Sequence, residues 1–493
     1  MNPITIVCYL LVAVVHLLFG VSINDCGFIL TALRLLLGLS FTSSSDLEAP
    51  QIQASIPTGV ESVLDFMSIE PQTTAYVCCP RCFQIYSFNP DDDSSYPDRC
   101  SHKDTRSSKP CNRLLRRAQR SKGPAPKPVR LFLYHDIREW LGQLYCRPEM
   151  EPILDRDILE QLNDDNAFWD ILDAPELREF RGPEGDPNRP FLKRPGNEGR
   201  LIFSLNMDGF NPYMNKQAGK KVSTGAIYLV CLNLPPAIRY NIENMYLVGI
   251  IPGPEEPSKH QINHVLRPLV NDLLQLWHDG IYLTSTPLHP RGRLIRGAVV
   301  PLVCDLPAAR QMSGFAPHSS HNFCSYCLLQ LDDIENFDHT TWTSRSFAAH
   351  KSCAEQWRDA ETEMERAELY ERTGVRWSEL LRLPYWDPTK FVVIDSMHGF
   401  FLRLLQRHCR DIWGMNVEYS DGDGASFHYD KNLPTDEEIS NGHVVLRTGT
   451  NSQLSKLSAP VLRQLCRDTQ TIRFGGGKKK LIRRLFQYVS ILI

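Results

Sequence analysis

The chain has 493 residues, of which 42% are hydrophobic and 10% aromatic, and its formal net charge is −3. This length is too great for one ordinary domain, so we expect two to four folded units. The near-neutral charge excludes a uniformly basic nucleic-acid binder and leaves local basic segments as the places where phosphate would be contacted. The fifteen cysteines include C-x-x-C pairs near histidines, which favours zinc in a reducing compartment over a disulfide scaffold.

Residues 1–57 combine two apolar segments with a polar linker. The first segment, 4–19, is almost wholly apolar, and the second, 28–39, is interrupted by Arg34. The first is short for a membrane span, which needs about 20 apolar residues, and it lacks the basic start of a signal peptide. We expect a buried helical hairpin or the remnant of a larger helical region; a signal sequence or membrane anchor is the alternative.

Residues 58–130 carry a cysteine knuckle followed by a basic linker. Two thiolates on one tight turn and two more ligands from a second turn suit tetrahedral zinc. The sequence therefore predicts a zinc site at Cys79, Cys82, Cys100 and Cys111, with His102 as the substitute ligand. Free buried cysteines are the alternative interpretation.

The basic linker, 113–130, contains seven Lys or Arg and no acidic residue. It is typical of a solvated linker or, alternatively, of a segment that contacts DNA phosphates. Residues 131–200 are expected to be a helical segment, because apolar residues recur at helical spacing. This segment ends in a Gly- and Pro-rich loop, 181–199, which marks a boundary.

Residues 201–416 show the pattern of an α/β core. Apolar runs at 201–208, 223–232 and 245–251 predict three consecutive strands, and a helical region, 260–277, follows. A fourth strand, 298–304, precedes a short helix that stops at Gly314. This order is what an RNase H-like nuclease core requires.

Two of these strands end in a carboxylate, Asp208 on the first and Asp305 on the fourth. Carboxylate oxygens are the ligands that Mg²⁺ prefers, and two such ions lie about 3.5–4 Å apart in phosphodiester-cleaving sites. We therefore expect Mg²⁺, or Mn²⁺, at these residues. A single strand-end Asp would be weak evidence, because many such residues only cap helices.

A second ligand-type cluster follows the fourth strand. Cys324 and Cys327 form another C-x-x-C pair, and His350 and Cys353 lie near the start of a helical stretch, 347–372. These four residues could complete a second zinc site. His318 and His321 are the competing pair of ligands.

A further apolar run, 391–394, ends in Asp395, and His398 lies three residues on. Both could face a site at a strand-to-helix junction, with Asp395 as a third catalytic carboxylate. A helix-capping Asp beside a packed His is an equally good interpretation.

The rest of the chain is polar and then basic. Residues 417–453 are expected to be a mobile linker, and 454–493 an amphipathic helix, a loop and a basic helix start. Cations at such a start could bind phosphate. The expected DNA-binding residues are those of an earlier basic turn and of this tail: Lys216, Lys220, Lys221, Lys478, Lys479, Lys480, Arg483 and Arg484.

Four motifs carry a family resemblance: LNMDGFNPY, CDLPAARQMSGFAPHSSHNFCSYC, GVRWSELLRLPYWDP and VIDSMHGFFLRLL. Together they resemble the CACTA-type (En/Spm-like) transposases of fungal genomes, over roughly residues 60–416. The resemblance implies an RNase H-like DDE/D domain that uses Mg²⁺ to cut and join transposon ends. Asp208 and Asp305 match the first two catalytic carboxylates, and Asp395-x-x-His398 is similar to the D-x-x-H signature.

The resemblance also implies a zinc-ribbon-type module at Cys79–Cys111, and the tail resembles a SAP motif, which binds DNA. Implied partners are transposon-end DNA and further copies of the chain, and the implied location is the nucleus. The chain departs from the family in lacking a late Glu on a helix, since Asp436, Glu437 and Glu438 are expected in a loop. It is therefore either a transposase or a truncated, catalytically inactive DNA-binding relic. A membrane-anchored protein of unrelated function is the third hypothesis.

Overall fold

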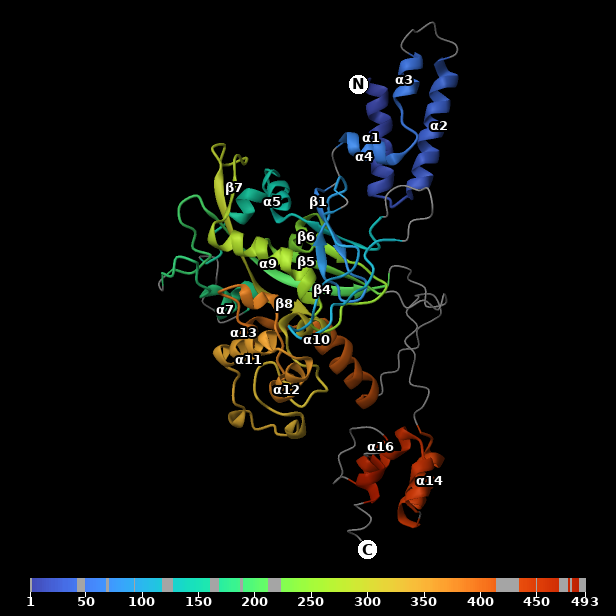
Figure 1. Cartoon of the computed structure of the whole chain (residues 1–493), viewed down its shortest axis with the longest axis vertical. Coiled ribbons are helices and arrows are strands. Elements are labelled where there is room, and N and C mark those ends of the chain that lie inside the picture. Colours follow the sequence, from blue (N-terminus) through green and yellow to red (C-terminus); the bar gives the residue numbers. More distant parts are fainter. Residues whose placement is uncertain are drawn as a thin grey trace. The chain divides into compact units, whose positions relative to one another are not determined.

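The computed structural model describes residues 2–41, 49–67, 71–92, 94–117, 127–159, 168–186, 189–211, 223–413, 434–448, 450–469, 478 and 481–486. The chain divides into two compact units, Met1–Cys409 and Arg410–Ile493, which we describe separately. Figure 1 shows the elements of each unit.

The larger unit is built on a mixed sheet of nine strands among the described residues, which confirms the expected α/β class. The central strands are β4 (Gly199–Phe210), β5 (Thr224–Cys231), β6 (Met245–Ile251), β8 (Arg293–Cys304) and β9 (Val392–Ile394). β4, β5 and β6 form an antiparallel meander, whereas β8 pairs in parallel with β4 and β9 in parallel with β8. The order across this part of the sheet is therefore β6-β5-β4-β8-β9. β7 (Ile281–Leu283) pairs antiparallel with the start of β8.

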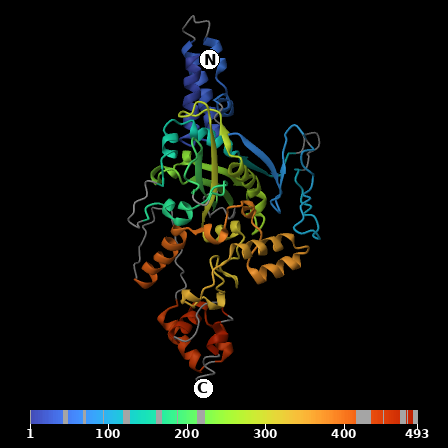
Figure 2. The ribbon, with the colours of Figure 1, turned by 90° about the vertical axis from the view of Figure 1, so that its left-hand side faces the viewer.

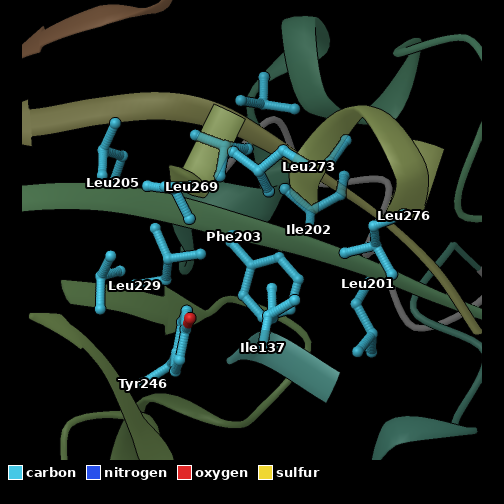
Figure 3. Packing of buried hydrophobic residues seen from close by; sticks show 14 of the residues in the cluster. Ile137, Leu201, Ile202, Phe203, Leu205, Leu229, Tyr246, Leu269, Leu273 and Leu276 are labelled. Carbon is cyan, nitrogen blue, oxygen red and sulfur yellow. The ribbon is translucent and has the colours of Figure 1, made fainter. Parts of the chain in front are cut away.

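Helix α9 (Ile262–His278) provides much of the core against this sheet, close to the predicted range. Its apolar residues recur every three or four positions, so one face is buried. Figure 3 shows Leu269, Leu273 and Leu276 of α9 packed with residues of β4, β5, β6 and α5 (Ile137–Tyr145). The following helix α10 (Leu306–Ser313) ends at Gly314, whose φ is +82°. A Cβ there would lie 2.3 Å from the Arg376 carbonyl oxygen, so glycine is required.

The cysteine-bearing segment extends the same sheet through β1 (Thr73–Cys78), β2 (Ile85–Ser87) and β3 (Leu131–His135). β3 pairs with β1 and with β6, so the start of the segment expected to be helical is a strand. Alternate residues explain this difference, because Phe132 and Tyr134 are buried while Leu131 and Leu133 are exposed. The expected helical character begins only at α5. Short helices α6 (Met150–Leu154), α7 (Pro175–Arg178) and α8 (Pro236–Arg239) follow.

The two apolar N-terminal segments are helices, α1 (Pro3–Leu17) and α2 (Ile23–Phe41). They pack with α3 (Ala49–Ser55) and α4 (Val60–Met67) around a small core that contains Val12, Leu30 and Val60. The expected hairpin is therefore present, but much of its apolar surface, including Leu18 and Phe28, is exposed. One window of α2, Ile23–Ser40, is long and apolar enough to cross a membrane by length and composition, and 11% of it is buried.

Residues 347–373 fold as two antiparallel helices, α11 (Phe347–Asp359) and α12 (Glu363–Thr373), rather than as one stretch (Figure 2). The helix breaks at Ala360, and Thr362 restarts it by accepting a hydrogen bond from the Glu365 amide at 3.1 Å. α13 (Pro388–Phe391) leads into β9, and a π-helical stretch, η7 (Met397–Leu405), follows it.

The smaller unit contains α14 (Asp436–Thr448), α15 (Asn451–Lys456), α16 (Ala459–Asp468) and a helical turn at 481–486. Leu454, Leu462 and Leu481 are among its buried residues. Part of the stretch expected to be a mobile linker is thus helical. The acidic group 436–438, expected in a loop, forms the first turn of α14, where negative charge is favoured by the helix dipole.

Candidate functional site

Three strand-end carboxylates lie at the same edge of the sheet. Asp208 and Asp305 each follow by three residues the aligned pair Leu205 and Leu302 of β4 and β8. Asp305 and Asp395 each follow by one residue an aligned pair of β8 and β9. Because β4, β8 and β9 run in parallel, their carboxyl ends bring the three predicted residues to one edge, which is where sites form in such sheets.

The buried thiol of Cys304 lies within the field of all three carboxylates. The pKa of this thiol is raised to about 12, chiefly by burial and in part by the negative charges of Asp305, Asp208 and Asp395. The Met207 amide donates a hydrogen bond to its sulfur at 3.1 Å. The Cys304 thiol is therefore protonated and uncharged, and it lies near three negatively charged carboxylates.

Two of the carboxylates also have local structural roles. Asp305 caps α10 by accepting from the Ala308 amide at 2.9 Å. Asp395 accepts from the Met397 amide at 2.9 Å and is hydrogen-bonded to His398 Nδ1. Partial burial raises the pKa of Asp395, but the bonds from His398 and Met397 outweigh it, so the pKa is lowered. Capping and metal binding are thus alternatives that share the same residues.

The donor set suits a hard divalent cation, since it consists of carboxylate oxygens. In the part of the chain that the structure describes, however, the three carboxylates are not among the groups whose ligand atoms all lie within 4.8 Å of one another. Asp208 is exposed near the end of β4. Binding an ion would therefore require these side chains to approach each other.

A cavity of about 190 Å³ adjoins Asp208 and Asp305, and Glu255 and Glu256 also line it. Glu256 accepts a hydrogen bond from the Ser223 hydroxyl. A Cβ on Gly209, next to Asp208, would lie 3.3 Å from Glu256 Oε1, a close contact that a small shift of the Glu256 side chain would relieve. Sequence reasoning missed these two glutamates; the signal was a Pro-flanked acidic pair directly after a buried strand.

The four thiols of the first cysteine cluster lie close together. The sulfurs of Cys79, Cys82, Cys100 and Cys111 form a group whose atoms all lie within 4.8 Å. Cys79 and Cys111 sulfurs are 3.8 Å apart, and those of Cys82 and Cys100 3.4 Å. Tetrahedral Zn–S bonds of about 2.3 Å place sulfurs about 3.8 Å apart, so this donor set fits zinc.

His102, the substitute ligand, lies outside this group of sulfurs. Its Nε2 is 3.2 Å from Asp104 Oδ1, and its ring packs edge-on against His264 at 4.5 Å. Asp104 is also contacted by His260 Nε2, at 3.4 Å. His102 therefore belongs to a network that joins the cysteine segment to the start of α9.

The second cluster is less converged. Cys324 and Cys327 sulfurs are 3.3 Å apart, and the backbone amides of Tyr326 and Cys327 each donate to the Cys324 sulfur at 3.4 Å. His350 on α11 is 3% exposed, and neither ring nitrogen has a hydrogen-bond partner. Burial lowers the pKa of His350 to about 4, so its ring is neutral and able to bind metal.

Cys353 lies one turn after His350 on α11, and its thiol is within electrostatic range of Arg345, as are those of Cys324 and Cys327. Arg345 Nε donates to the Cys324 carbonyl at 2.8 Å. Of the competing pair, both exposed, His321 Nδ1 is 3.7 Å from Asp332. Among the described residues, none of these candidate ligands belongs to a group of three or more whose ligand atoms all lie within 4.8 Å of one another. The donor set fits zinc, but its two halves lie on separate elements.

The predicted DNA-binding cations are only partly described. Lys478 and Arg483 are exposed on the smaller unit, and Arg484 is half-buried. The remaining predicted cations, Lys216, Lys220, Lys221, Lys479 and Lys480, lie outside the described residues.

One comparison with known proteins gives a match for part of the chain. Residues 189–368, less than half of the chain, match the model of the transposase family tnp2. This part of the chain is similar to those transposases. The match runs from just before β4 into α12, so it contains Asp208, Asp305 and the second cysteine cluster and excludes Asp395 and the first. No curated protein matches the chain.

Proposed function

We propose that this chain is a transposase-derived protein with an RNase H-like core that binds transposon-end DNA and cleaves it with a divalent metal ion. The observation that carries the proposal is the placement of Asp208 and Asp305 on neighbouring parallel strands inside the segment that matches the tnp2 transposases. The strand order β6-β5-β4-β8-β9, three antiparallel strands followed by two parallel ones, also supports an RNase H-like core.

In this mechanism Asp208 and Asp305 would hold the ion and Asp395 would be a third ligand. The ion, when bound, activates the attacking oxygen and stabilises the leaving one. Asp305 is oriented by the first turn of α10, and Asp395 by His398. Water would form a bond to the phosphorus at the transposon end, and the 3′ oxygen would leave as a hydroxyl. That hydroxyl would then form a bond to a target phosphorus, whose own 3′ oxygen would leave as a hydroxyl.

A second candidate function, a DNA-binding relic without catalysis, is favoured by one observation. Asp305 and Asp395 already serve as local hydrogen-bond acceptors, and the three carboxylates are not within 4.8 Å of one another among the described groups. Such residues could persist for their capping role after catalysis is lost.

The experiment is cleavage of a labelled duplex that carries the terminal repeat of the element encoding the chain, with Mg²⁺ or Mn²⁺. Asp208→Asn and Asp305→Asn should each reduce cleavage by more than about 100-fold, since even residues outside the ligand shell are worth 10–100-fold. Asn still caps α10, so the Asp305→Asn protein should melt like the wild type.

Asp387→Asn is the matched control, because Asp387 caps α13 through the Thr389 amide and precedes β9 rather than following it. It should cleave normally. If the wild type binds the duplex but does not cut it with either metal, the relic is the correct function. If it neither binds nor cuts, the proposal is wrong.

A further inference from the structure

A hollow of about 960 Å³ lies where three parts of the larger unit meet. Arg81, Lys109 and Arg113 of the cysteine segment line it, together with Gln261 at the start of α9 and Glu363 at the start of α12. In Figure 2 the loops of the cysteine segment (light blue) lie next to α11 and α12 (orange). The three parts are far apart in sequence, so only the folded chain forms this surface.

Hydrogen bonds between the three parts hold the walls of the hollow. The Ser107 amide and hydroxyl donate to the Glu361 carbonyl at 3.1 and 2.7 Å. The Ser108 hydroxyl donates to Glu363 at 3.0 Å, and Gln261 Nε2 donates to the Arg81 carbonyl at 3.4 Å. The cysteine segment is thus connected to both helices, and the hollow is a built feature.

The two carboxylates that line the hollow make hydrogen bonds, whereas its three cations have no ion-pair partner among the described residues. Its two carboxylates have partners, since Asp104 is contacted by His102 and His260 and Glu363 by Ser108. The three cations are exposed, and among the described residues none of them has a carboxylate within 4.0 Å. The Ser108 hydroxyl does not neutralise Glu363, so the three cations and two carboxylates leave the hollow with a formal charge of +1.

We propose that the hollow is a docking site for the phosphate backbone of DNA, with Arg81, Lys109 and Arg113 as the contacting cations. The identity of the polymer rests on the proposed function. The first cysteine cluster positions all three cations: Arg81 lies between Cys79 and Cys82, and Lys109 and Arg113 lie two residues before and after Cys111. The contacts position DNA without reading its sequence, as phosphate contacts do.

The test is binding of a fluorescein-labelled duplex by the full chain, measured as anisotropy over a salt titration without divalent metal or chelator. The variant carries Arg81→Gln, Lys109→Gln and Arg113→Gln. Each phosphate contact contributes about 0.9 to the slope of log K against log salt, so the slope should fall by about 2 to 3. The loss should be equal on unrelated duplexes.

The matched control carries Lys103→Gln, Arg106→Gln and Arg117→Gln. These cations are exposed in the same segment but do not line the hollow, so net charge changes equally while the slope should change by less than about 1. Equal slopes for the two triple variants would overturn the proposal. If the hollow variant loses its bound zinc, the single change Lys109→Gln replaces it, with an expected slope change of about 1 and no change as the contrary result.

This outcome is separable from that of the proposed function. Asp208→Asn should bind with the wild-type slope, because the assay contains no divalent metal. Cleavage by the wild type together with unchanged slopes would support the nuclease proposal and contradict the proposal that the hollow binds DNA. A reduced slope for the hollow variant, with no cleavage by any of the proteins, would support DNA binding by the hollow and contradict the nuclease proposal.

Discussion

The two cysteine clusters began as the same kind of sequence prediction, a C-x-x-C pair with further ligands downstream, and the fold treats them differently. In the first, Cys79 and Cys82 lie in the turn between β1 and β2, Cys100 and Cys111 lie in loops shortly after β2, and the four sulfurs lie within 4.8 Å of one another. In the second, one pair lies on a loop and the other on α11, and convergence is incomplete. Ligands on a shared short segment are brought together by local structure, whereas ligands on separate elements depend on how those elements pack.

The largest expected effect comes from breaking the first cluster. Cys82→Ala should remove one zinc per chain and lower the stability of the cysteine segment by more than about 5 kcal/mol, because the binding free energy of structural zinc is folding free energy. Zinc content by elemental analysis and a thermal melt measure this. Cys146→Ala, at an exposed cysteine that belongs to neither cluster, is the control and should change neither quantity.

Replacing His350 in the second cluster should have opposite effects on zinc binding and on the stability of the zinc-free protein. His350→Leu should lower zinc content by one per chain in the loaded protein. After zinc is removed with a chelator it should stabilise the protein by about 1–3 kcal/mol, because it removes a buried ring whose nitrogens have no partner. Stabilisation in both states, with unchanged zinc content, would mean that His350 is a packing residue.

The dependence of stability on pH should also distinguish the two clusters, because a buried histidine lies beside the first (His264) and in the second (His350). Burial, with the nearby His102 and Arg267, lowers the pKa of His264 to about 3, below the unfolded value of about 6.5. The unfolded chain therefore takes up a proton first, and stability should fall by up to about 1.4 kcal/mol per pH unit below pH 6.5.

His264→Gln should flatten the dependence of the free energy of unfolding on pH between about pH 6.5 and 5.5. His278→Gln, at an exposed position on the same helix, should leave the slope unchanged. His350 should contribute a similar slope only after zinc removal, since a ligated ring cannot accept the proton. An equal His350 contribution with and without zinc would contradict ligation.

The smallest effect should come from the arginine beside each cluster. Arg345 donates to the Cys324 carbonyl, and Arg130 donates to the Cys79 carbonyl. Arg345→Gln and Arg130→Gln should each weaken zinc binding about 10-fold at the adjacent cluster alone, as loss of a supporting residue typically does. Competition with a colorimetric chelator measures this. Equal weakening of both sites by either change would point to a global loss of structure.

The fold was predictable wherever one residue pattern dominated. The strand that carries Asp208, the strand that precedes Asp305, helix α9 and the stop at Gly314 follow from apolar periodicity and from the glycine itself. β3 was missed because five residues beside a strong helical pattern are too few to show alternation. α14 was missed because a polar, Gly-containing stretch resembles a linker until α16 covers its few apolar residues.

By itself, the sequence determined which residues can carry chemistry here: three carboxylates after apolar runs, and two sets of thiols at ligand spacing. Local forces suffice for such features, because a strand, a cap or a knuckle depends on near neighbours. Only the tertiary structure decided that β8 lies between β4 and β9, that Glu255 and Glu256 share the cavity of Asp208, and that a basic hollow forms beside the first cluster. Those results depend on long-range burial of apolar surface, which local patterns do not specify.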